Sequence, residues 1–415
     1  MNYLKKYFKG DPHIWAIIVG LSVFSILAVY SASSSLAFHS ASGNTAFHIL
    51  RHSRHLAIGL AMTFFLHMLP PSRYYARISQ WLIWISILLL ILTMFSGVEE
   101  NDAFRRLKIF SFTFQSSDLA KIALIMFLSQ QLALRQEEIL NFKKTVLPVF
   151  SLTAFVCLLI LPSNFSTAVM LFVVCVMLLF VARVSFRKLT VLCIITMALG
   201  MALVTGLYGL QKAGVNNAVT QRATTWVNRI DRYFDKNTED NGLEKNYQAV
   251  QAKIAIGTGG IFGKGPGNSV QRNFLPHAYS DYIFAIIIEE YGVAGGLVVL
   301  FLYLSLLYRA ILIVRKCDKT FQAFLVMGLS LMVVIQAFVN MAVAVGLLPV
   351  TGQPLPLISM GGNSIIFTGA ALGIILNVSR ELSKQEEVTI LKTGDKKLTK
   401  LVPESLEETI LTNNT

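Results

Sequence analysis

Apolar runs of membrane-spanning length recur along the chain, and they constrain its fold more than any other feature. Ten such runs can be placed in the 415 residues. They cover residues 14–36, 55–69, 79–96, 118–134, 145–161, 165–182, 189–209, 282–308, 321–347 and 362–380. A helix needs about 20 predominantly apolar residues to cross the hydrocarbon layer. Because the runs are continuous rather than alternating, they predict an all-α polytopic membrane protein with about ten transmembrane helices.

The overall composition agrees with this prediction. Hydrophobic residues make up 54% of the chain and charged residues only 14%, too little polar material to cover a soluble protein of this size. The first run lacks a clear small-residue cleavage site, so we expect it to remain as a transmembrane helix. The four cysteines show no CxxC or metal-binding spacing, which predicts free thiols.

Lysine and arginine positions predict the orientation, because short cytoplasmic segments collect these residues. With the N-terminus inside, the short outer loops carry only Arg51, Arg54, Arg105, Arg106 and Lys108. An even number of helices then returns the C-terminus to the cytoplasm. We predict a cytoplasmic N-terminus at residues 1–13, a transmembrane domain at 14–382, and a disordered cytoplasmic tail at 383–415.

A large outer loop is predicted between the seventh and eighth helices, at about residues 210–281, and it carries nine Lys and Arg residues. Long loops escape the charge rule, so the loop could meet an anionic ligand or simply lie beside lipid headgroups. Its glycine-rich part matches neither a phosphate-binding loop nor a dinucleotide fingerprint. The loop enters the next apolar run at Asp281, and an ionisable residue at such depth indicates function.

Two further segments carry unusual residues. Asp118 and Lys121 are three residues apart and therefore share a helix face. They form either a structural ion pair at a helix start, or a site where Lys121 meets a substrate anion. Three prolines prevent residues 346–362 from forming a continuous helix. Broken backbone at membrane depth must be buried or line a cavity, which places this segment over the centre of the bundle.

Together these segments resemble the SEDS (shape, elongation, division and sporulation) family over residues 14–382. The matching signatures are Gln115-x-Ser-Asp-x-Ala-Lys121, then Ala255-Ile-Gly-x-Gly-Gly-x-Phe-Gly263 to Asp281-Tyr-Ile-Phe-Ala285, and Gly346-Leu-Leu-Pro349 with Pro354-Leu-Pro-x-Ile-Ser-x-Gly-Gly362. Residues 267–271 resemble the FtsW branch more than the RodA branch.

The resemblance implies a glycosyltransferase that polymerises lipid II at the outer face of the bacterial cytoplasmic (inner) membrane during cell division. Asp281 falls on the family's essential carboxylate, which would act as general base on the acceptor hydroxyl while polyprenyl diphosphate leaves. The signatures and the adjoining loop supply the substrate-binding candidates, which are Lys121, Asp118, Gln115, Lys264, Ser280, Ser359 and Gly361.

The resemblance also has implications for cofactors and binding partners. A divalent cation, Mg²⁺ or Mn²⁺, could support the leaving group, although no metal-ligating residue is assigned and no organic cofactor is expected. The expected partners are lipid II and the growing glycan strand, a class B penicillin-binding transpeptidase, other divisome proteins and membrane lipids. No nucleic acid is expected.

The chain departs from the family pattern at several positions. Ser116 and Asp118 stand where the family usually has Pro and Glu, and Met360 stands where it has Tyr. Leu275-Pro-His-Ala-Tyr-Ser-Asp281 replaces the usual Leu-Pro-Glu-x-His-Thr-Asp, and residues 162–167 replace Gln-Pro-Asp-x-Gly-Thr. The alternatives are a RodA-type elongation polymerase, a lipid II flippase or transporter, and a silent scaffold. A transporter needs polar groups across the whole bilayer, whereas the ionisable candidates gather in the outer half.

Overall fold

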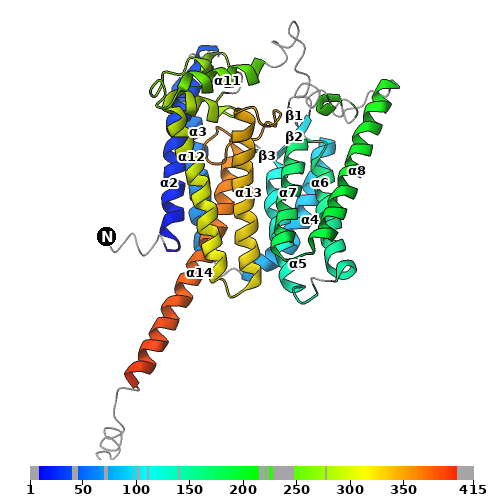
Figure 1. The fold of residues 1–415 in the computed structure, drawn as a ribbon, viewed down its shortest axis with the longest axis vertical. Helices are drawn as coiled ribbons and strands as arrows, with labels where there is room; N and C mark the ends of the chain where they lie inside the picture. The colour runs from blue at the N-terminus through cyan, green and yellow to red at the C-terminus, as the bar shows by residue number, and fades with distance from the viewer. Residues whose placement is uncertain are drawn as a thin grey trace, which may run out of the picture.

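The computed structural model describes residues 9–39, 45–69, 73–96, 98–100, 103–109, 112–138, 141–214, 220, 224–227, 247–275 and 278–399. Long helices run side by side and form a bundle (Figure 1). They are α2 (Pro12–His39), α3 (Thr45–Met68), α4 (Arg73–Ser96), α5 (Ser116–Leu134), α6 (Leu147–Ile160), α7 (Phe165–Val181), α8 (Phe186–Lys212), α12 (Ile283–Lys316), α13 (Thr320–Ala344) and α14 (Asn363–Thr399). A π-helical turn (Phe142–Val146) precedes α6, and the shorter α11 (Tyr247–Gly259) lies in the predicted large loop.

Each of the ten predicted apolar runs lies on one of these long helices, so the helical polytopic fold is confirmed. Among the described residues, eight helices are long and apolar enough to cross a membrane. The other two are α7, which has only 17 residues, and α3, whose first half carries arginines and histidines. The exact number of crossings stays a prediction.

A small sheet lies between α4 and α5, and the all-α prediction did not include it. Strands β1 (Val98–Glu100), β2 (Ala103–Ile109) and β3 (Phe112–Gln115) pair antiparallel in the order β1-β2-β3. Leu107 pairs with Phe114, and Arg106 pairs with Gln115. The strands are too short to give a strong period-two signal in the sequence. Because β3 leads directly into α5, the sheet fixes where α5 begins.

The bundle has two distinct ends (Figure 1). Helix α2 begins and α14 finishes at one end, which we call the terminal end, whereas α11 and the small sheet lie at the opposite end, the loop end. This arrangement agrees with the prediction that both termini lie on the same side. That the terminal end faces the cytoplasm stays a prediction.

The predicted disordered tail is wrong for residues 383–399, because α14 continues to Thr399. The buried part of α14 has already met the cost of helix nucleation, so each further residue is added cheaply. Two ion pairs also join α14 to residues 316–319, and one of them involves Glu386 in the extension itself. Lys316 lies 3.0 Å from Glu386, and Lys319 lies 3.3 Å from Glu381. Residues 400–415 lie outside the described part of the chain.

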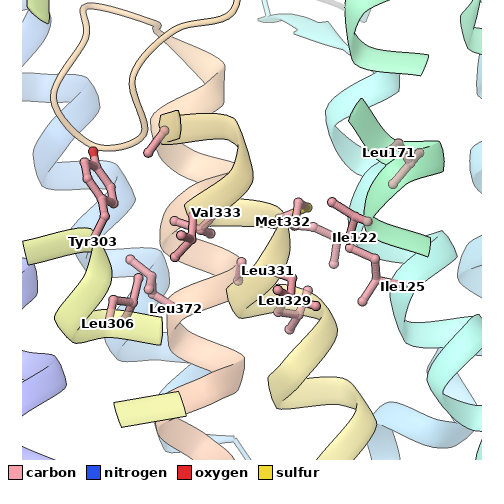
Figure 2. Packing of buried hydrophobic residues seen from close by; sticks show 14 of the residues in the cluster. Ile122, Ile125, Leu171, Tyr303, Leu306, Leu329, Leu331, Met332, Val333 and Leu372 are labelled. Carbon is pink, nitrogen blue, oxygen red and sulfur yellow. The ribbon is translucent and has the colours of Figure 1, made fainter. Parts of the chain in front are cut away.

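Helix α13 lies in the middle of the bundle and organises its core. Figure 2 shows its buried side chains between α5 on one side and α12 on the other. Leu329 and Met332 lie on the side of Ile122 and Ile125, whereas Val333 lies on the side of Tyr303. In a bilayer such contacts stabilise through van der Waals packing rather than through removal of water. Because α13 is packed on both sides, it gives rigid support to the residues that follow its C-terminal end.

Helix α12 is interrupted at Gly292. Its backbone there has φ 71° and ψ −177°, a conformation that is essentially restricted to glycine. Residues 260–261 pack directly on this break, with Val293 N donating to Gly260 O at 2.9 Å and Ala294 N donating to Ile261 O at 3.2 Å. A Cβ atom at Gly292 would collide with the backbone of Ile261. The break therefore seats the chain that follows α11 against α12.

Gly292→Ala is expected to lower the free energy of unfolding by roughly 3 kcal/mol or more, because it adds backbone strain to a steric collision. Thermal unfolding of the detergent-solubilised protein measures this change. The matched control is Gly200→Ala in α8, where no neighbour lies within 4 Å of the added Cβ and alanine favours the helix. Equal melting temperatures for the two variants would show that the break at Gly292 is not strained.

Candidate active site

Asp281 lies at the loop end, half-buried and immediately before α12. Its backbone carbonyl accepts a hydrogen bond from Asn340 Nδ2 of α13 at 2.9 Å. Its carboxylate Oδ1 accepts a hydrogen bond from Ser280 Oγ at 3.0 Å. On the other side, Oδ2 is 3.7 Å from where a Cβ of Gly352 would stand. The backbone of Asp281 is therefore held by α13, and its carboxylate is held by Ser280 and faces residues 346–362.

Residues 346–362, which we call the broken segment, contain no helix, as their prolines predicted. The segment is tied to the residues just before Asp281. Ser359 Oγ donates to Ser280 O at 2.6 Å, and Met360 N donates to Tyr279 O at 2.9 Å. From below, Tyr303 of α12 points toward the segment (Figure 2), and its hydroxyl donates to Pro356 O at 2.5 Å. The segment thus forms a fixed wall beside Asp281.

Two amide side chains of α13 hold the broken segment. Asn340 Nδ2 donates to Gln353 O at 2.7 Å, and Gln336 Nε2 donates to Pro354 O at 3.0 Å. The two residues are four apart and share one helix face. Sequence reasoning missed both of them. The available signal was a pair of amides at helical spacing within an apolar run, since a polar group there needs a partner.

Lys121 and Asp118 form a buried ion pair with Nζ and Oδ1 2.8 Å apart, so their predicted common face is confirmed. Lys121 Nζ also donates to Gln336 Oε1 at 3.4 Å, which links the pair to the broken segment. Gln115 lies at the N-cap of α5 without a side-chain capping bond, and its Nε2 donates to Ser117 Oγ at 2.9 Å. The geometry fits a structural ion pair, and it also directs Lys121 toward the wall beside Asp281.

Residues 162–167, where the chain departs from the family pattern, also contact the broken segment. Asn164 caps α7 by accepting from Thr167 N at 3.2 Å. Gln353 Nε2 donates to Thr167 Oγ1 at 2.7 Å and to Asn164 Oδ1 at 3.4 Å. The start of α7 is therefore part of the same hydrogen-bonded group. Sequence reasoning noted this stretch but did not place it at the site.

Lys264 lies apart from this group, in an ion pair with Glu289 at 2.7 Å. Glu289 is buried and also accepts from Ser269 Oγ at 2.5 Å and from Val270 N at 3.1 Å. The neighbouring Glu290 accepts from Ser269 N at 3.3 Å and from Ser31 Oγ. Glu289 follows Asp281 by eight residues, or about 12 Å along a helix. The structure therefore uses Lys264 to anchor its loop.

The remaining candidates differ in position. Ser280 and Ser359 are joined beside Asp281, and Gly361 packs against Pro354 in the broken segment, where its Cβ would lie 3.2 Å from Pro354 Cβ. His277, which replaces the usual glutamate, lies outside the described residues. All four cysteines are free thiols, as predicted. Burial, together with Asp318 and Glu381, raises the pKa of Cys317 to about 12, so this thiol stays protonated.

The described residues gather no group of three or more His, Cys, Asp or Glu side chains that could hold a metal ion. Asp118 is already neutralised by Lys121. A metal held by protein ligands alone therefore does not fit the described part of the site. Mg²⁺ commonly binds through one or two carboxylates and the phosphates of a substrate, and only that shared mode is compatible with Asp281.

Comparison with known proteins places this chain in a family. The cell cycle protein family of FtsW, RodA and SpoVE matches residues 12–384. A probable peptidoglycan glycosyltransferase FtsW from Idiomarina loihiensis is 30% identical over 340 residues, which cover 80% of this chain and 78% of the relative. A second, from Nitrosococcus halophilus, is 35% identical over 304 residues, covering 72% and 74%. The stage V sporulation protein E of Bacillus subtilis is 32% identical over 73% of this chain and 79% of its own.

Solved structures agree with the sequence relatives. A chain from a study titled "Structural coordination of polymerization and crosslinking by a peptidoglycan synthase complex" matches with a TM-score of 0.68 and 26% identity, over 90% of this chain and 98% of that chain. A mutant of the rod shape determining protein RodA from Thermus thermophilus matches with a TM-score of 0.63 and 25% identity, also over 90% and 98%. This chain belongs to the FtsW, RodA and SpoVE family of multi-pass membrane proteins, and its relatives support the FtsW branch.

Proposed function

We propose that this chain polymerises lipid II into peptidoglycan glycan strands during cell division, at the outer face of the bacterial cytoplasmic membrane. One observation carries the proposal, which is the half-buried Asp281 fixed between α13 and the broken segment. The names of the FtsW relatives, which call them probable peptidoglycan glycosyltransferases, support the same reaction. The loop end, where Asp281 lies, would then be the outer end of the bundle.

In this reaction Asp281 acts as the general base. Its carboxylate takes the proton from the 4-hydroxyl of the acceptor sugar, and the resulting oxygen attacks the anomeric carbon of the donor. The bond from that carbon to the lipid diphosphate breaks, and the configuration at the carbon inverts. Ser280 and Asn340 fix the carboxylate and its backbone, so little reorganisation is needed when the proton moves.

The leaving diphosphate needs positive charge nearby. Lys121 can supply part of it if a substrate anion competes with Asp118 for its ammonium group. A Mg²⁺ or Mn²⁺ ion, held jointly by Asp281 and the substrate phosphates, would supply Lewis-acid stabilisation of the leaving group. Ser359 and Gly361 would position the sugars from the broken segment, whereas Gln115 and Lys264 would act by holding α5 and the loop.

The proposed partner is a class B penicillin-binding transpeptidase, which would cross-link the new strand while other divisome proteins control the pair. The solved complex of a peptidoglycan synthase, whose chain shares this fold, supports such a pairing. Lipid II, the growing glycan strand and membrane lipids complete the proposed partners.

The test is polymerisation of purified lipid II by the full chain together with its transpeptidase. We expect glycan strands and the release of polyprenyl diphosphate in equal proportion to the glycosidic bonds formed. Transport of labelled lipid II across vesicles, without any polymer, would replace this function by that of a flippase. The described ionisable residues Asp118, Lys121, Asp281, Glu289 and Glu290 all lie within about two helical turns of the start of α5 or α12. Their position near one end of the bundle favours chemistry at one face over transport.

A further inference from the structure

We propose that Lys253 of α11 binds the diphosphate of the lipid-linked substrate. The inference rests on the proposed polymerase function and names a cation that neither the signature segments nor the relatives assign. Lys253 is exposed and lies six residues before the end of α11. Because Lys253 is part of a helix, its backbone has a defined place beside the broken segment.

Lys253 extends across Gly346, where the broken segment begins. A Cβ atom at Gly346 would lie 2.6 Å from Lys253 Cε and 3.4 Å from its Nζ. The stem of the lysine thus occupies the space that any larger residue would fill. Gly346 itself has φ 79°, which favours glycine. The backbone and the lysine are therefore fitted to each other, and the ammonium group is brought to the broken segment.

The other described cations near the site already have protein partners. Lys121 is paired with Asp118, and Lys264 is paired with Glu289. Arg272 Nη1 donates to Ser31 Oγ at 3.0 Å. Lys253, in contrast, makes no hydrogen bond or ion pair with the described residues. An ammonium group that has no partner among the described residues and lies beside the broken segment is available for an anion from outside the chain.

Lys253 and Asp281 both border the broken segment. Asp281 is placed to act on the acceptor hydroxyl, and Lys253 is placed to bind the leaving diphosphate. Lys253 lies against Gly346, and Asp281 lies against Gly352. Six residues span at most about 20 Å, so the base and the cation are within reach of one sugar unit and its diphosphate. A lysine ammonium is a compact charge with three donors and suits phosphate oxygens well. The alternative role is that Lys253 offsets the negative C-terminal end of α13, which would affect stability alone.

The test measures the affinity of the full chain, in detergent, for geranylgeranyl diphosphate. The same measurement with geranylgeraniol, which lacks the diphosphate, is the uncharged reference. Lys253→Met is expected to weaken diphosphate binding about 10-fold or more, the range of a hydrogen bond to a charged group, and to leave geranylgeraniol binding unchanged. Lys253→Arg should restore most of the affinity. The matched control is Lys212→Met, which removes the same charge at a lysine stacked 4.8 Å over Tyr208 and should bind like wild type.

Polymerisation of lipid II by the same variants completes the test, with a raised KM expected for Lys253→Met. Unchanged diphosphate affinity in Lys253→Met overturns the proposal, and a lower melting temperature with that result assigns the lysine to the end of α13. Equal weakening in Lys212→Met also overturns it, because the effect would then be one of overall charge. If wild type binds the diphosphate but makes no glycan, the polymerase function fails, and Lys253 is still judged by the binding data.

Discussion

Asp281→Asn is expected to reduce glycan polymerisation by roughly 10²–10⁴-fold, the usual contribution of a general base, while the protein stays folded. Asparagine has the same shape and can still accept the hydrogen bond that Ser280 Oγ gives to Oδ1. The Asn340 bond to the backbone carbonyl of residue 281 is also kept. The negative charge and the capacity to take a proton are lost while the packing is kept, so the change separates the chemistry from the packing.

Polymer length and yield from purified lipid II measure this effect, and the melting temperature confirms that the fold is intact. The graded control is Ser280→Ala, which removes one hydrogen bond to the carboxylate. A single hydrogen bond contributes about 1 kcal/mol, so this variant should lose about tenfold or less. If Asp281→Asn keeps activity within that smaller range, Asp281 does not act as the base, and the acceptor proton must leave by another group.

The features that sequence reasoning captured here depend on local signals. Apolar runs of spanning length identify the helices because the bilayer sets their length. The three prolines identify the broken segment because they cannot continue a helix. Asp118 and Lys121 face each other because three residues make nearly one helical turn. The position of Asp281, at a junction between polar and apolar chain, likewise needs no knowledge of distant residues.

What sequence reasoning missed depends on contacts between distant residues. The pairing of Gln353 with Thr167 spans 186 positions, and the bond from Gln336 to Pro354 depends on how the segment folds back on α13. The partner of Lys264 could not be read from the sequence either, because Glu289 is 25 residues away. The small sheet and the extension of α14 have weak local signals. The ion pair with Glu289 shows that Lys264 holds its loop, and its role in substrate binding stays a prediction.

The ion pair between Lys121 and Asp118 provides the second large effect. Lys121→Met is expected to lower the free energy of unfolding by about 3–5 kcal/mol, because it leaves a buried carboxylate without its counter-charge. Both side chains are almost fully buried, with exposures of 6% and 5%, so solvent cannot compensate. Methionine keeps the length of the lysine stem, which limits the loss of packing. Thermal or denaturant unfolding in detergent measures the change.

The double variant Asp118→Asn with Lys121→Met separates the two roles that the sequence left open. Removing both charges should restore most of the stability, since no unpaired charge then remains in the interior. If the pair is only structural, polymerisation should return with the stability. We expect instead that the stabilised double variant stays at least about tenfold less active, because a cation that approaches the leaving diphosphate is still missing. Full activity in a stable double variant would remove Lys121 from substrate binding and leave the leaving-group charge to be met by Lys253 or a metal ion.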